Sequence, residues 1–235
     1  MKLRILVAGG CHVVGYPIGE QFSFPSVARD TLALRGTEIE WRTMARVPIK
    51  HVKCLMDAVD TFIPDVVVLQ VGNYETNITF RERFLKSLGL KTIKETGYTV
   101  SLPAEFPFRG KWTWRLKCAV KLGLDTLLGH PLVDSGEVRQ KVSAMFGALA
   151  ERGPRHVIVL GPLPCADPLY MRYRRRLARV FEEEASQRNF LYLKVTEAPI
   201  QSSNWFVDAT HLNRWGQTHL AQVLTEALAP FFAER

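Results

Sequence analysis

The stretch ILVAGGCHVVGYPIG, which runs from Ile5 to Gly19, decides the fold. It begins as an apolar run, passes through two glycines to Cys11, and reaches Gly15 four residues later. A continuous apolar run is typical of a strand that is buried on both faces of a parallel sheet. Open α/β sheets carry their chemistry at the carboxyl ends of such strands. Cys11 is therefore a candidate nucleophile, and a small buried apolar residue is the alternative interpretation.

Similar apolar runs recur along the chain and alternate with helical patterns. The expected strands are Leu3–Ala8, Glu38–Thr43, Asp65–Val71, His156–Gly161 and Phe190–Val195. The expected helices are Ser26–Leu34, His51–Phe62, Glu137–Arg152, Tyr170–Arg188 and about Arg214–Phe232. This alternation predicts an α/β fold with a doubly wound, flavodoxin-like parallel sheet of five strands in the order 2-1-3-4-5.

Length and composition favour one globular domain over residues 1–235. The chain has 235 residues, of which 47% are hydrophobic, so it can bury a full core. It holds no apolar run of the roughly 18 residues that a membrane span needs, and its short N-terminal run suits a core strand better than a signal peptide. The four cysteines (Cys11, Cys54, Cys118 and Cys165) have no metal-ligand spacing. We therefore expect free thiols and a cytoplasmic location, and no metal or other cofactor.

One region, about residues 76–134, interrupts the strand–helix alternation. It interleaves aromatic and basic residues, with nine lysines or arginines and three acidic residues between Arg83 and His130. Long irregular insertions in compact domains are usually functional loops, so a lid or cap is predicted, with a helix over Trp114–Leu128. The positive charge of this region could bind an acidic substrate or carrier, an anionic membrane surface or, less well, nucleic acid. The alternative is that the basic residues form an ordinary solvated surface.

Near the C-terminus, Asp208 and His211 stand three residues apart, just before the last expected helix. At that spacing the carboxylate can hold one imidazole nitrogen and leave the other available as a base. Alone, the pattern is more typical of an aspartate that caps a helix beside a surface histidine. His12, directly after Cys11, is expected to be an exposed turn residue, with tuning of the thiol or contact with substrate as the alternative.

Together these motifs resemble those of the SGNH (GDSL-like) hydrolase family. The family has a Gly-Asp-Ser turn followed by a glycine, a Gly-x-Asn-Asp block, a strand with a proline-rich turn and helix, and a final Asp-x-x-His. The corresponding segments here are Gly9-Gly10-Cys11 with Gly15, Gly72-Asn73-Tyr74-Glu75, residues 157–185, and Asp208 with His211. The resemblance covers most of the chain outside the insertion.

The chain departs from the family pattern at three places. Cys11 replaces the nucleophilic serine and Gly10 the preceding aspartate. The family's second-block glycine has no counterpart in the segment 45–48. In the third block, Tyr74 occupies the asparagine position without a gap, whereas Asn73 does so with a one-residue shift. We favour Asn73, because an amide can donate to an oxyanion.

The resemblance implies an acyl-transfer enzyme that uses a Cys-His-Asp triad and a thioester acyl-enzyme. In that scheme Cys11 attacks, His211 moves the proton and Asp208 orients His211, while the Cys11 N–H and Asn73 form the oxyanion hole. The substrate would be a small or carrier-bound acyl compound. The enzyme would be an esterase or thioesterase if water accepts the acyl group, and an acyltransferase if an amine or alcohol does. A catalytically inactive SGNH-like binding module is the alternative, with an acidic partner docked at the basic insertion.

Overall fold

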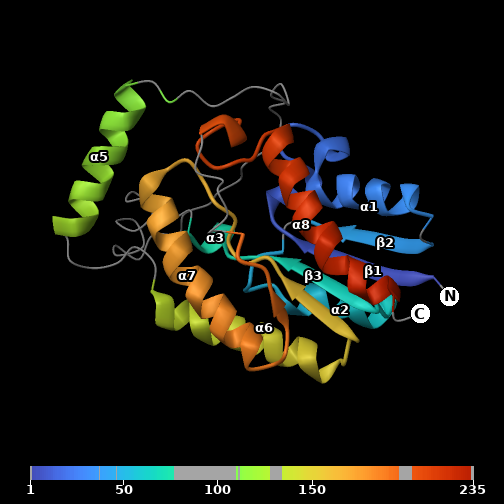
Figure 1. Ribbon diagram of the computed structural model, residues 1–235. Coiled ribbons are helices and arrows are strands. Elements are labelled where there is room, and N and C mark those ends of the chain that lie inside the picture. The colour runs from blue at the N-terminus through green and yellow to red at the C-terminus, as the bar shows by residue number, and fades with distance from the viewer. Residues whose placement is uncertain are drawn as a thin grey trace.

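The central sheet has the predicted architecture (Figure 1). The computed structural model describes residues 2–36, 38–45, 47–76, 110, 112–127, 134–195 and 203–233. Five strands form one parallel sheet in the order β2-β1-β3-β4-β5, which confirms the fold class. The strands are β1 (Leu3–Gly9), β2 (Ile39–Met44), β3 (Val66–Gln70), β4 (His156–Val159) and β5 (Leu191–Tyr192). The last two are shorter than expected.

Helices cover both faces of the sheet, as expected of a doubly wound fold (Figure 1). They are α1 (Phe24–Leu34), α2 (Val52–Phe62), α3 (Asn73–Thr76), α5 (Trp112–Leu127), α6 (Ser135–Glu151), α7 (Pro168–Ser186) and α8 (Arg214–Ala233). Short 3-10 turns are formed by η1 (Cys11–Val14), η2 (Glu20–Phe22) and η3 (Ser203–Trp205).

The alternation of side chains along β1 divides the core into two halves. Leu3, Ile5 and Val7 pack with α1 and α8 on one face. Leu6 and Ala8 point the other way and pack with α2, α6 and α7. Because both faces of β1 are buried from Ile5 onward, its sequence from Ile5 to Gly9 is apolar, and its carboxyl end lies inside the sheet where Cys11 follows.

Within the predicted insertion, the structure describes the first residue, Thr76, then Gly110, residues 112–127 and the last residue, Asp134. The helix α5 matches the expected helix within two residues and lies outside α7 (Figure 1). The remaining part of the predicted lid lies outside the described residues. In the part of the chain that is described, no helix is both long enough and apolar enough to cross a membrane.

Candidate active site

Glycines shape the turn that presents Cys11 at the end of β1. A Cβ atom on Gly9 would lie 2.4 Å from the carbonyl oxygen of Gln70, so only glycine fits there. Gly15 has a φ of 66° and ends η1, where its N–H donates to the carbonyl groups of Cys11 and His12. These contacts fix the short turn in which Cys11 is the first residue, half-buried at the carboxyl end of the sheet.

The Asp208–His211 motif forms a closed turn before α8. The Asp208 Oδ1 atom accepts hydrogen bonds from the backbone N–H groups of Thr210 and His211, both at 2.7 Å. Its Oδ2 atom lies 2.8 Å from His211 Nδ1. A backbone hydrogen bond from Val207 to the His211 carbonyl closes the turn. The carboxylate therefore fixes both the backbone and the imidazole ring of this segment. Because Nδ1 is held by Asp208, the other ring nitrogen, Nε2, can contact Cys11.

Cys11 and His211, which are 200 positions apart in the sequence, meet at this end of the sheet. Burial opposes a charge on His211, but hydrogen bonds with Asp208 and Cys11 and the charge of Asp208 outweigh it and raise its pKa to about 9. Burial also opposes ionisation of Asp208, yet its contacts with His211 and with the two N–H groups lower its pKa to about 2. At neutral pH the pair is an imidazolium and a carboxylate, and the positive ring favours a thiolate at Cys11.

Two further aromatic side chains enclose the His211 ring. The centroid of the His12 ring lies 5.4 Å away, and Tyr16 packs edge-on at 5.0 Å. His12 is 2% exposed, so the expectation of an exposed turn residue is wrong. Burial, followed by the neighbouring charge of His211, lowers the pKa of His12 well below its ordinary value. The site thus holds one charged and one neutral histidine.

Asn73 is buried beneath the site and joins three segments. Its Oδ1 accepts a hydrogen bond from the Leu163 N–H at 2.7 Å, and its Nδ2 lies 3.3 Å from His12 Nδ1. Since the neutral His12 ring can accept at Nδ1, Asn73 is a donor to His12 in this arrangement. Its role as an oxyanion donor stays a prediction.

Tyr74, the next residue, is the neighbour of Cys11 that sequence reasoning passed over. Its hydroxyl oxygen lies 3.2 Å from Cys11 Sγ. The gapless reading of the third block would have identified it, since that reading places Tyr74 where the family has its asparagine. A tyrosine hydroxyl can donate to a thiolate or to an oxyanion, as an amide can.

Gly10, which has no side chain, lies directly beside the Tyr74 ring. A Cβ atom at Gly10 would lie 3.2 Å from Gln70 Oε1 and 3.5 Å from the Tyr74 ring. A larger residue, such as the aspartate that the family has here, would compete with that ring for space. Gly10 and Tyr74, two of the departures from the family pattern, are therefore neighbours beside Cys11.

A buried arginine supports the floor of the site. Arg174 of α7 is 1% exposed, and its guanidinium donates to the carbonyl groups of Leu163 and Pro164 and to the Thr76 hydroxyl. Because the Leu163 N–H in turn holds Asn73, Arg174 fixes the turn after β4 against α3.

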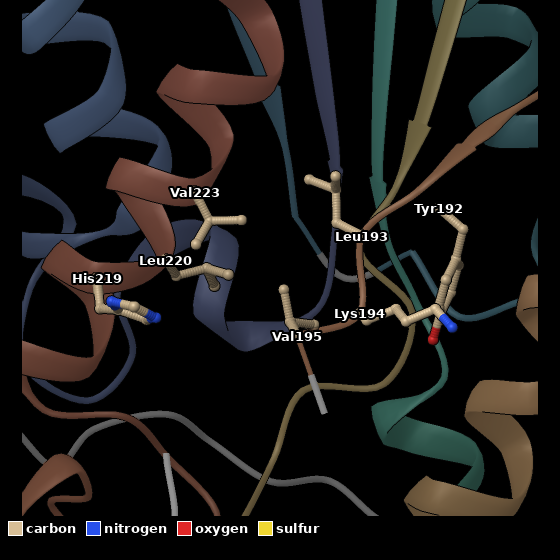
Figure 2. Close-up of a pocket in the computed structure, with 7 residues that line it drawn as sticks. All are labelled: Tyr192, Leu193, Lys194, Val195, His219, Leu220 and Val223. Atoms are coloured by element: carbon tan, nitrogen blue, oxygen red, sulfur yellow. The ribbon is translucent and has the colours of Figure 1, made fainter. Parts of the chain in front are cut away.

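A cavity of about 180 Å³ lies between the end of β5 and α8 (Figure 2). Figure 2 shows Leu193 and Val195 on one side of it, and His219, Leu220 and Val223 on the other. None of Cys11, Asn73, Tyr74, Asp208 or His211 lines this cavity, so it is separate from the thiol.

Comparison with solved structures places the fold among ester-cleaving enzymes. A lipase/acylhydrolase from Enterococcus faecalis is 14% identical with a TM-score of 0.59, covering 97% of this chain and 95% of that one. A family 3 carbohydrate esterase from Clostridium thermocellum is 13% identical with a TM-score of 0.60, covering 100% and 98%. A member of the lipolytic G-D-S-L family from Veillonella parvula is 13% identical with a TM-score of 0.59, covering 97% and 98%. The chain therefore has the fold of these hydrolases. The sequence itself matches no protein-family model and no curated protein.

Proposed function

We propose that the protein is an acyl-transfer enzyme of the SGNH type in which Cys11 is the nucleophile. The observation that carries this proposal is the hydrogen-bonded series Asp208–His211–Cys11 at the carboxyl end of β1. The same end of the sheet carries the chemistry in open α/β folds, and solved proteins with this fold include a lipase/acylhydrolase and a carbohydrate esterase. An ester or thioester is the substrate class that fits this arrangement.

In the acylation half-reaction, the Cys11 thiolate attacks the carbonyl carbon of the substrate. The π electrons of the carbonyl move to its oxygen and form a tetrahedral oxyanion. When the carbonyl re-forms, the bond to the leaving oxygen or sulfur breaks, and His211 gives its Nε2 proton to that leaving group. The product is a thioester on Cys11 and a neutral His211, which Asp208 keeps oriented.

The oxyanion needs donors that are fixed before the reaction. The backbone N–H of Cys11 is one such donor in this proposal, and the Tyr74 hydroxyl, which already lies 3.2 Å from Sγ, is the second. Asn73 supports this arrangement through His12, and it contacts the oxyanion directly only if its amide turns from His12.

In the second half-reaction, neutral His211 takes a proton from the acceptor as the acceptor attacks the thioester. The tetrahedral intermediate collapses, the carbon–sulfur bond breaks, and the Cys11 thiolate and protonated His211 are restored. Water as acceptor gives a hydrolase, and an amine or alcohol gives an acyltransferase. Thioesters react comparatively well with amines, which makes transfer a realistic outcome for a cysteine enzyme.

The test is the intact mass of the protein after mixing with an activated acyl thioester, followed by product analysis with and without added amine. We expect one acyl adduct on the parent protein, none on Cys11→Ala, and an unchanged adduct on Cys54→Ala. Cys54 is an exposed thiol on α2 and is therefore a matched control.

A binding module without activity would give a different pattern. Labelling with a thiol-reactive probe at mildly acidic pH would then modify Cys11 no faster than Cys54. Preferential labelling of Cys11 that is lost in His211→Gln supports the enzyme, because only an imidazolium beside the thiol maintains a thiolate at that pH. Equal labelling of the two thiols would contradict the proposal.

A further inference from the structure

The helix α5 turns its apolar side outward. Its large apolar residues Trp112, Leu116, Val120, Leu124 and Leu127 recur at spacings of three and four, so they form one stripe along the helix. Their exposed fractions range from 44% to 83%. These five make up more than half of the nine large apolar residues that are exposed in the described part of the chain. A helix that packs on a core normally has the opposite arrangement.

Polar contacts, together with the burial of Cys118 and the packing of Leu122 against the core, hold α5 in this orientation. On the inner side, Lys121 Nζ lies 3.0 Å from Oδ2 of Asp167, the residue that caps α7. The Tyr173 hydroxyl donates to Asp125, and Arg172 lies 3.6 Å from the same carboxylate. Rolling the stripe inward would break these contacts and leave the Asp167 side chain, which is only 2% exposed, without Lys121. The apolar stripe is thus held facing solvent.

The charges beside the stripe are positive. Arg115 and Lys117 are exposed on α5, and Arg172, Arg175 and Arg176 are exposed on the neighbouring first half of α7. The one acidic residue in the described part of α5, Asp125, has a side chain only 7% exposed, and it faces Arg172. Apolar residues bordered by arginine and lysine, on a helix at the edge of the molecule, have the composition of a helix that lies in a membrane interface (Figure 1).

We propose that α5 docks the protein on a lipid surface that carries anionic headgroups. The apolar stripe enters the boundary between headgroups and acyl chains, and the basic residues beside it remain among the phosphates. A second copy of the chain fits this surface less well, since two positive faces would have to meet. The proposal depends on α5 and α7 alone and does not require the chemistry of Cys11.

The test is co-sedimentation with phosphatidylcholine vesicles prepared with and without phosphatidylglycerol. We expect the parent protein to sediment with the anionic vesicles and to remain in solution with the neutral ones. The double variant Leu116→Glu/Val120→Glu should lose binding by at least about tenfold, since burial of two apolar side chains is replaced by two like charges at the anionic surface. Leu34→Glu, at a site 90% exposed at the end of α1, is the matched control and should bind as the parent does.

Three results would overturn the proposal. One is equal behaviour of the parent protein with the two kinds of vesicle, and another is parent-like binding by the double variant. The third is a dimer that light scattering detects without vesicles, if Leu116→Glu abolishes it and Leu34→Glu does not. The apolar stripe would then be a contact between two copies of the chain. All three substituted positions are exposed, so circular dichroism should show the parent fold in every variant.

Discussion

At the scale of single residues, a nucleophilic thiol at Cys11, as proposed above, requires a different role of His211 than a serine would. A serine hydroxyl requires a neutral histidine that can take its proton during attack. A thiol can instead lose its proton beforehand to a histidine of raised pKa, and the pKa of His211 is raised to about 9. Asp208 raises this pKa independently of Cys11, so the surroundings of the ring suit a thiol, whose proton can leave before the attack.

This argument predicts the effect of Cys11→Ser. In the variant, His211 retains the contact with Asp208 that raises its pKa but loses the contribution of the Cys11 thiol, and it must take a proton from a hydroxyl, which is a far weaker acid than a thiol. We expect acyl transfer from an activated thioester to fall at least about 10-fold, because any share of His211 that stays protonated cannot act as a base during attack. The rates of Cys11→Ser, Cys11→Ala and the parent protein measure this. A serine variant as fast as the parent would show that the site does not depend on a thiol.

Tyr74→Phe tests the hydroxyl that lies 3.2 Å from Sγ. Removal of a hydrogen bond to a charged group costs about 1.5–3 kcal/mol, so acylation should slow by about 10- to 100-fold. The thiolate should also become less favoured, which moves the labelling of Cys11 to higher pH. Tyr170→Phe, in which the ring on α7 remains but the hydroxyl is lost, is the control and should leave both measurements unchanged. An unaltered rate in Tyr74→Phe would remove this hydroxyl from the mechanism.

At the scale of elements, Arg174 links α7 to the turn after β4 and to α3. Arg174→Met should lower the free energy of unfolding by about 2–4 kcal/mol, since each buried carbonyl left without a donor costs about 1–3 kcal/mol. Urea unfolding measures the change. The exposed neighbour Arg175→Met should unfold like the parent, and an equal loss in both variants would mean that burial of the guanidinium is not the cause.

The elements and the site were predictable to different degrees. The nearly continuous apolar runs of β1, β3 and β4 show in the sequence that these strands are buried on both faces of a sheet. The alternation of strands and helices then predicted the strand order. The placement of Asn73 and Tyr74 did not, because one residue of shift at the start of α3 decides which side chain reaches Cys11 and which reaches His12. The burial of His12 depends on Asn73 and His211, which lie far along the chain.

At the scale of the whole molecule, the Asp208–His211 pair makes stability depend on pH. The pKa of His211 is raised from 6.5 to about 9, so its contribution is complete below about 6.5 and is lost as pH rises through 9. The pKa of Asp208 is lowered from 3.8 to about 2, so its contribution is present above 3.8 and is lost as pH falls toward 2. The free energy of unfolding should therefore fall between pH 6.5 and pH 9.

Urea unfolding at those two pH values checks this expectation, with His211→Gln as the comparison. The variant has no imidazole to titrate, so the alkaline decline should be smaller in it than in the parent. An equal decline in the two proteins would assign the pH dependence to other groups.

The contacts that hold α5 also make its attachment sensitive to dissolved ions. Lys121–Asp167 and Arg172–Asp125 are ion pairs, and the Debye length falls from about 10 Å at 0.1 M salt to about 3 Å at 1 M. Added sodium chloride should speed amide hydrogen exchange in α5 and leave α2, which packs through Leu55, Met56 and Val59, nearly unchanged. Slower exchange in α5 with salt would mean that apolar packing dominates. Where ion pairs hold α5 on α7, ionic strength sets the fraction of molecules in which α5 is detached, while the central sheet stays folded.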